Sequence, residues 1–179
     1  NIQDRNYTSW DLVNAKSLKP LEDSLDICPI KLKLLNQDIF NFEQGELNII
    51  HSTTRSMKCI PGVLVLEGNR MYGKVKRNRY YYRVVPDDRR LPEFLMPYTP
   101  KIGFEKKQKN KYVVFQFKEW TGKHPICSNV QTIGDVGVLE NFYEYQLYCK
   151  SLYASIQDFT KKTMRALKIK SEEVFIDEI

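Results

Sequence analysis

The sequence has few of the residues on which disulfide scaffolds and metal centres depend. Its 179 residues include four cysteines and two histidines. The cysteines are far apart and form no CxxC pair, which excludes a disulfide-rich secreted scaffold and favours free thiols in a reducing compartment. No stretch approaches the ~20 uninterrupted apolar residues that a bilayer span requires, and the first ten residues lack a secretory pattern. We therefore expect an intracellular protein, cytoplasmic or nuclear, with no membrane partner.

Glycine and proline are also sparse, at eight each, so collagen-like and low-complexity chains are excluded. Hydrophobic residues make up 42% and charged residues 28%, which is the balance of a globular protein. At ~150 residues per domain the length allows one domain, or two if each is a barrel of ~70 residues. Since the chain begins with Asn1 instead of methionine, we expect it to be a piece of a longer protein.

Positive charge is concentrated in the middle third of the chain. Lysine and arginine number 28 against 22 acidic residues, for a formal net charge of +6. The stretch from Arg70 to Arg90 contains eight basic residues and two acids, and the stretch from Lys101 to Lys111 contains five lysines and one acid. Such clustering predicts a polyanionic partner.

Short apolar runs separated by turn residues predict a mainly β protein. Val113, Phe115 and Phe117 alternate along one such run, as in a strand buried on one face. Because no helix intervenes between the runs, we expect an antiparallel meander that closes into a β-barrel. The predicted strands are 47–51, 61–67, 71–74, 80–85, 112–120 and 130–136.

The periodicity changes after residue 140. Apolar side chains recur at spacings of three and four from Tyr145 to Phe159, which predicts one helical stripe with a break near residues 154–158. The predicted organisation is a first small β unit in residues 1–55, a second in residues 56–138 and a helical segment in residues 139–179.

The stretch from Arg70 to Arg83 combines cations with tyrosines. A groove for single-stranded nucleic acid needs both, because cations neutralise phosphates and flat rings stack on bases. By strand alternation Tyr80 and Tyr82 share one face, and Tyr81 and Arg83 share the other. The alternative is that the tyrosines pack inside the barrel and the cations form a solvated face. The candidate nucleic-acid-binding residues are Arg70, Lys74, Lys76, Arg77, Arg79, Tyr80, Tyr82, Arg83, Arg89, Arg90, Lys106, Lys107 and Lys109.

Metal and nucleophile chemistry have little support in the sequence. His124 and Cys127 form an HxxC pair, but tetrahedral zinc requires four ligands. A strand, not a helix N-terminus, is predicted after Cys127, so nothing there activates its thiol. Asp87 and Asp88 are adjacent and cannot both face one metal site. We predict no catalytic residue, metal site or cofactor in this chain.

Two segments carry a recognisable pattern. Residues 80–92, YYYRVVPDDRRLP, contain a strand and an Asp-Arg-Arg-Leu-Pro turn, and residues 109–137 contain a KxVV-type strand, Trp120, Pro125 and Ile133-Gly134-Asp135. Over residues 60–136 this order and spacing closely resemble the second cold-shock domain of the ribonuclease II and ribonuclease R family, which includes the eukaryotic exosome exonucleases. Asn36 to Phe40 is similar to the end of the family's first cold-shock domain.

The resemblance implies one or two OB-type barrels that guide single-stranded RNA toward a Mg²⁺-dependent 3′-to-5′ exonuclease domain beyond this chain. Residues 139–179 would then be a helical linker toward that domain. Where the family pattern has base-stacking aromatics, residues 62–65 have none, so electrostatic guidance by the basic turns is expected. Two alternatives remain: a free-standing binding or scaffolding relative without a nuclease domain, and a hydrolase with an unrecognised site.

The basic residues fall into two groups with different expected roles. Lys74 to Arg79 reads as a hairpin tip, where long cations meet solvent or phosphate. Pro86 and Pro92 bracket the turn that holds Arg89 and Arg90, and an arginine in such a turn can pair with a carboxylate. We expect a structural role for at least one of these two arginines, with an RNA contact as an equally weighted alternative.

Overall fold

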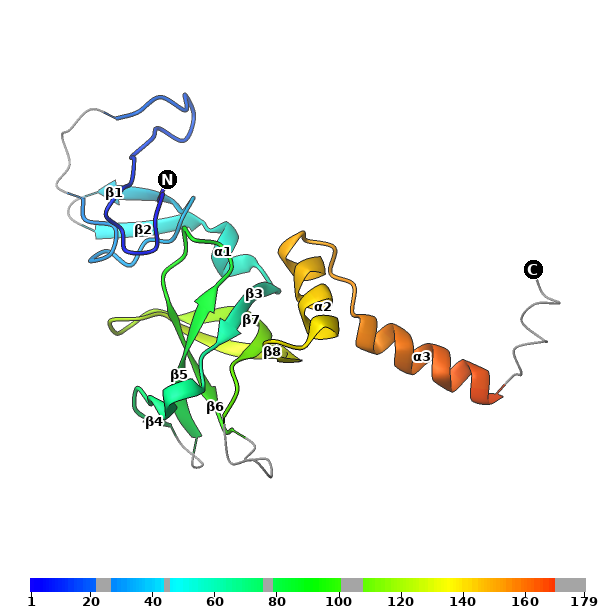
Figure 1. Cartoon of the computed structure of the whole chain (residues 1–179). Coiled ribbons are helices and arrows are strands. Elements are labelled where there is room, and N and C mark those ends of the chain that lie inside the picture. Colours follow the sequence, from blue (N-terminus) through cyan, green and yellow to red (C-terminus); the bar gives the residue numbers. More distant parts are fainter. Residues whose placement is uncertain (22–26, 44–45, 76–78, 101–107, 170–179) are drawn as a thin grey trace.

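The computed structural model describes residues 1–21, 27–43, 46–75, 79–100 and 108–169 (Figure 1). The strands are β1 (Ile39–Glu43), β2 (Glu46–His51), β3 (Ile60–Leu64), β4 (Lys74–Val75), β5 (Arg79–Pro86), β6 (Phe94–Tyr98), β7 (Lys111–Glu119) and β8 (Ile126–Asp135). The helices are α1 (Thr53–Ser56), α2 (Leu139–Cys149) and α3 (Ile156–Ile169), with a short 3-10 turn at Glu67–Asn69.

Five strands close into a barrel. Around it the order is β3, β7, β8, β6 and β5, and β5 pairs again with β3. The neighbours are antiparallel, apart from a parallel contact between β6 and β8 at Leu95 and Ile126. β4 extends the sheet beside the start of β5. The mainly β barrel expected from the sequence is therefore confirmed, and β3, β5 and β6 form its meander.

Strand alternation explains the core of the barrel. Tyr82 and Val84 on β5 and Phe94 and Met96 on β6 are buried, and they face Phe115 of β7. The rings of Phe94 and Phe115 lie 5.1 Å apart. Each fully buried side chain of this size contributes roughly 1.5–3 kcal/mol from apolar burial. The barrel interior is thus filled by side chains.

Gly62 lies where β3 passes between its two neighbours. A Cβ atom there would approach both the Phe115 ring and the Val85 carbonyl oxygen to 2.9 Å. Real Cβ atoms do not come so close to a backbone oxygen, so a side chain at this position would push β5 and β7 apart. Glycine at position 62 therefore permits the pairings that close the barrel.

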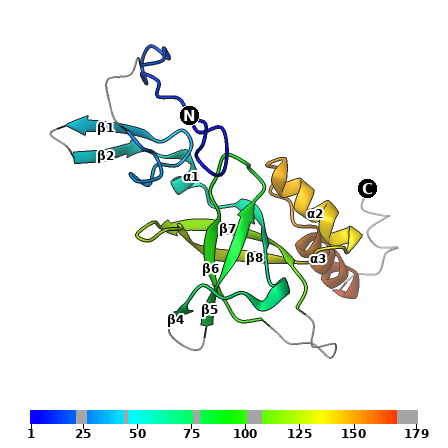
Figure 2. The ribbon, with the colours of Figure 1, turned by 60° about the vertical axis from the view of Figure 1, so that its left-hand side comes forward.

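The described part of residues 1–55 forms a hairpin of β1 and β2 with loops beside it (Figures 1 and 2). Ile2, Tyr7 and Leu35 pack against Trp120 at the end of β7, with the rings of Tyr7 and Trp120 edge to face at 6.3 Å. The sheet here has two strands in the described residues. The barrel that closes is the one in residues 60–135.

The C-terminal segment consists of two helices and not of one continuous stripe. Tyr145 and Tyr148 of α2 pack on Val114 and Ile133 of the barrel. The chain then leaves helical geometry, and α3 extends away from the barrel (Figure 1). Phe159 of α3 is 70% exposed. The expected helical content is confirmed, and the break that was expected near residues 154–158 lies at residues 150–155, between the two helices. In the described residues no helix has the length and apolar character of a membrane span.

Candidate nucleic-acid interface

The outer face of β5 and β6 carries an aromatic side chain beside a cation. Tyr81 and Arg83 point outward because their neighbours in β5 point into the core. In the antiparallel register Tyr81 opposes Pro97 and Arg83 opposes Leu95. These four side chains are partly exposed and share one face. A mixed apolar and cationic surface of this kind can contact both a base and a phosphate.

The segment between β3 and β5 brings a second tyrosine to this face. The Tyr72 amide donates to the Tyr81 carbonyl at 2.9 Å, and the Tyr81 amide donates to the Gly73 carbonyl at 2.9 Å. Two residues therefore oppose one, as in a β-bulge, and Gly73 has a φ of +122° that glycine adopts readily. The Arg70 guanidinium lies 5.3 Å from the centre of the Tyr72 ring, in a cation–π contact.

The turn between β7 and β8 reaches the same place. The ring of His124 meets Tyr72 edge to face at 6.5 Å. The next residue, Pro125, accepts a hydrogen bond from the Leu95 amide at 2.8 Å, which fixes the turn against β6. Two loops from different parts of the sequence therefore join beside β5.

Exposed cations occur in the same segments as this aromatic cluster. Arg70 contacts the Tyr72 ring, and Lys74, Arg79 and Lys123 are exposed nearby in sequence. Arg83 is partly covered, and its guanidinium donates to the Glu93 carboxylate at 3.1 Å. We name the outer face formed by Arg70, Tyr72, Tyr81, Arg83 and His124 the β5 face.

Two candidate residues from the sequence face the wrong way. Tyr82 is 2% exposed inside the barrel, and its ring meets that of Tyr98 edge to face. Tyr80 is partly buried and packs on the same core. Strand alternation assigns both to the inner face, and the buried Tyr82 ring cannot stack on a base in this fold. The interior packing considered as an alternative is correct for these two tyrosines, and Tyr81 is the tyrosine of β5 that faces outward.

The other candidates are distributed over several loops. Lys76, Arg77, Lys106 and Lys107 lie outside the described residues. Lys109 is exposed just before β7.

Arg89 and Arg90 lie together on the turn between β5 and β6. Arg90 forms a fork with Asp88: its Nε and Nη2 each donate to a carboxylate oxygen at 2.9 Å. Burial acts to raise the pKa of the Asp88 carboxyl, but the hydrogen bonds from Arg90 outweigh it, and the pKa is lowered from its usual value. Arg89 is exposed. The structural pairing expected for one of these arginines is therefore found at Arg90.

Sequence reasoning missed three members of the β5 face. Tyr81 had a usable signal, because alternation assigns it to the same face as Arg83. Tyr72 and His124 had no such signal, since their contact depends on how two loops fold over the barrel. Residue spacing along the chain contains no information about that contact.

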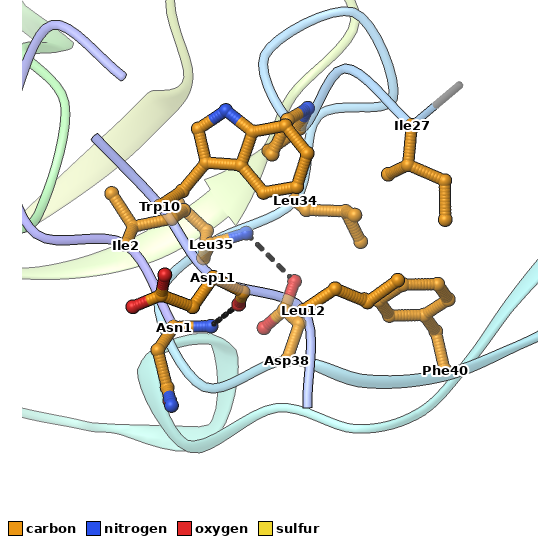
Figure 3. Close-up of a pocket in the computed structure, with 11 residues that line it drawn as sticks. Asn1, Ile2, Trp10, Asp11, Leu12, Ile27, Leu34, Leu35, Asp38 and Phe40 are labelled. Atoms are coloured by element: carbon orange, nitrogen blue, oxygen red, sulfur yellow. Dashed lines mark hydrogen bonds between the residues drawn. The ribbon is translucent and has the colours of Figure 1, made fainter. Parts of the chain in front are cut away.

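The N-terminal unit contains a hollow that could be considered as a second binding site (Figure 3). Trp10, Asp11 and Asp38 help to line it. Asp38 accepts a hydrogen bond from the Leu35 amide at 2.9 Å, and Asp11 accepts one from the Gln3 side chain at 2.6 Å. Two carboxylates repel a phosphate, so the hollow does not suit a nucleic-acid backbone.

The HxxC pair is split between two environments. Cys127 is fully buried in the barrel core, and burial raises the pKa of its thiol, so it remains protonated and packs as an apolar side chain. His124 lies on the β5 face against Tyr72. Within the described ranges, no three His, Cys, Asp or Glu side chains gather closely enough to hold a metal ion.

Comparison with known proteins found no family model and no curated protein that matches this chain.

Proposed function

We propose that this chain binds single-stranded RNA through the β5 face of an OB-type barrel. The strand order supports the barrel type. A meander of three strands is followed by a hairpin whose second strand returns parallel to the third, and this is a five-stranded Greek-key arrangement. OB-type barrels bind oligonucleotides on their second and third strands and on the loops that follow the first and fourth strands.

The observation that carries the proposal is the edge-to-face contact between the rings of Tyr72 and His124. Tyr72 belongs to the loop after the first barrel strand, and His124 belongs to the loop after the fourth. Tyr72 pairs through its backbone with Tyr81 of the second strand, and Pro125, which follows His124, accepts a hydrogen bond from Leu95, the residue opposite Arg83. The two loops and the strand face that this barrel type uses for oligonucleotides therefore form one aromatic and cationic surface.

Single strands suit this surface better than duplexes. The tyrosine and histidine rings can stack only on bases whose faces are open, whereas paired bases are already stacked on one another. The exposed cations around the rings would neutralise phosphates without reading sequence. We therefore expect binding that tolerates many sequences and depends strongly on salt.

The similarity to ribonuclease II and ribonuclease R proteins extends the proposal. In that setting the barrel would guide RNA toward a Mg²⁺-dependent nuclease domain in a longer protein, and this chain would bind without cleaving. A free-standing binding protein would use the same surface. Measuring the length of the open reading frame distinguishes these two versions.

The test is a titration of fluorescent RNA followed by anisotropy. A single strand of roughly 12 nucleotides exceeds the site of many OB-type barrels, and its duplex serves as the matched control. Each phosphate contact should contribute about −0.7 to the slope of log K against log salt, so four contacts give about −3. Equal affinity for the duplex, or binding that does not weaken as salt rises, would overturn the proposal.

A further inference from the structure

Arg83, the cation of the β5 face that lies on β5 itself, forms an ion pair with Glu93. The Arg83 guanidinium donates to Glu93 at 3.1 Å, and the two side chains are 38% and 30% exposed. Both are thus accessible to solvent and to a ligand. The pair lies next to Tyr81, which is two residues before Arg83 on the same face of β5.

The backbone register fixes this pairing. Arg83 opposes Leu95 across β5 and β6, and Glu93 precedes Leu95 by two residues, so Glu93 and Leu95 point to the same side. The contact between Arg83 and Glu93 is therefore diagonal between neighbouring strands, a distance that long side chains span. The register therefore holds the Glu93 carboxylate within reach of the Arg83 guanidinium in the ligand-free chain.

We infer that Glu93 is an internal competitor for the phosphate group that binds Arg83. A carboxylate and a phosphate offer a guanidinium the same kind of charged oxygen acceptor, so one must leave before the other binds in full. This inference rests on the proposed RNA binding at the β5 face. It adds that affinity is limited by an acidic residue of the same chain.

The competition should weaken binding without preventing it. Half-exposed ion pairs are only slightly favourable, because water screens them, so a phosphate can displace Glu93 at a small cost. Glu93 also places a negative charge beside the path of the RNA backbone, which repels the ligand until the pair opens. Release of Glu93 frees Arg83 for one more phosphate contact.

The test compares the unmodified chain with four variants, each titrated with the same labelled single-stranded RNA. Glu93→Gln keeps the size of the side chain and removes its charge. It should bind about two- to five-fold more tightly than the unmodified chain, which is the range expected for loss of one surface ion pair. Its salt slope should be steeper by up to about 0.7, because Arg83 then contacts a phosphate in every bound molecule and not only in the fraction that has released Glu93.

Arg83→Gln and the double variant Arg83→Gln/Glu93→Gln show whether Glu93 acts through Arg83. When Arg83 is already replaced by Gln, Glu93→Gln should raise RNA affinity only by the small effect of removing a nearby negative charge. The control is Glu140→Gln, which removes the same charge from an exposed position on α2 and should leave affinity unchanged.

The possible failures are distinguishable. If the unmodified chain binds no RNA at low salt, the proposed function fails. If it binds RNA but Glu93→Gln changes neither affinity nor salt slope, the competition is wrong while RNA binding stands. An equal gain in the presence and absence of Arg83 would show that Glu93 acts as a general repulsive charge, which also overturns the inference. Melting temperatures within a few degrees of the unmodified chain, by the size scaling of small domains, confirm that all four variants are folded.

Discussion

Arg5 holds the carbonyl oxygen of Pro86 through a hydrogen bond of 2.6 Å from its Nη2 atom, although the two residues are far apart in sequence. Its Nε atom also donates to the Leu91 carbonyl at 3.2 Å. The two acceptors lie at the two ends of the turn between β5 and β6. One arginine from the N-terminal unit therefore closes that turn and links the unit to the barrel.

Arg5→Ala should destabilise the protein, because it leaves two partly buried carbonyl groups without a donor. A cost of about 1–3 kcal/mol in the free energy of unfolding is expected for such a loss. Urea unfolding followed by circular dichroism measures it. The control Lys16→Ala removes an exposed cation from the same unit and should change the free energy of unfolding by less than about 0.5 kcal/mol. Equal effects from the two variants would contradict the structural role of Arg5.

Arg89 and Arg90 should differ although they are neighbours. Arg90→Ala removes the fork to Asp88 and should lower stability by up to about 1 kcal/mol, whereas Arg89→Ala should have almost no effect. The pKa of Asp88 is lowered in the folded state, so its contribution is present above the unfolded value near 4 and lost as pH falls through the lower folded value. The stability gap between the unmodified chain and Asp88→Asn should therefore narrow below about pH 4. If this difference in unfolding free energy stays constant down to the acid transition, the ion pair between Asp88 and Arg90 does not contribute to stability.

Lys74 and Arg79 should act on RNA and not on folding. Both are exposed near the start of β5, where Lys74 pairs with Tyr80 and Arg79 pairs with Val75, so the two cations lie on opposite faces of the β4–β5 ribbon. The double variant Lys74→Ala/Arg79→Ala should flatten the salt slope by about 1.4, which corresponds to two phosphate contacts. Its melting temperature should stay nearly unchanged. An unchanged salt slope would remove these two residues from the interface.

The tyrosines of the middle third should divide into two classes. Tyr72→Ala and Tyr81→Ala should each weaken RNA binding by about 1–3 kcal/mol, the usual value for a stacked base, with small effects on stability. Tyr82→Ala should instead cost about 3–5 kcal/mol in folding free energy, because it empties a large volume in the core. Anisotropy and urea unfolding on the same proteins provide both numbers. A binding defect confined to a folded Tyr82→Phe variant would reverse the assignment.

The purified chain should not shorten RNA in the presence of Mg²⁺ or Mn²⁺. Two-metal hydrolysis needs several converging carboxylates, and several acids of the barrel that the structure describes are instead paired with cations, as in Asp88 with Arg90 and Asp135 with Lys111. End-labelled RNA incubated with the protein and either metal, then resolved on a denaturing gel, checks this. Shortening that persists through repurification and disappears with a chelator would support the hydrolase alternative.

Much of the barrel was predictable because its strands alternate. The pattern in β5 placed Tyr82 and Val84 on one face without showing that this face is the inner one, and the pattern of Val113 and Phe115 gave the inner face of β7. Val114 did not fit the alternation, because it lies on the opposite face of β7 and is also fully buried. The reason is that α2 covers the other face of β7 at this point, so the strand is buried on both sides. A local pattern cannot reveal which element packs on the far side of a sheet.

β6 was missed because its identity depends on partners distant in sequence. The segment Phe94–Tyr98 contains Pro97 and shows no polar alternation, and both features argue against a strand. It is nevertheless held between β5 and β8. The same dependence on distant contacts explains why composition assigned Tyr82 to the interface and did not assign Tyr72 or His124.

The double pairing of β3 has a consequence for folding kinetics. β3 must contact β5 and then β7, and its partner Phe115 lies more than fifty residues from Ile60 along the chain. Contacts of such high sequence separation form slowly, because a long loop loses its entropy before the pairing stabilises it. We expect the β5–β6 hairpin to assemble early and the seam at Gly62 to form late. Substitution of Gly62 should then accelerate unfolding more than it slows folding.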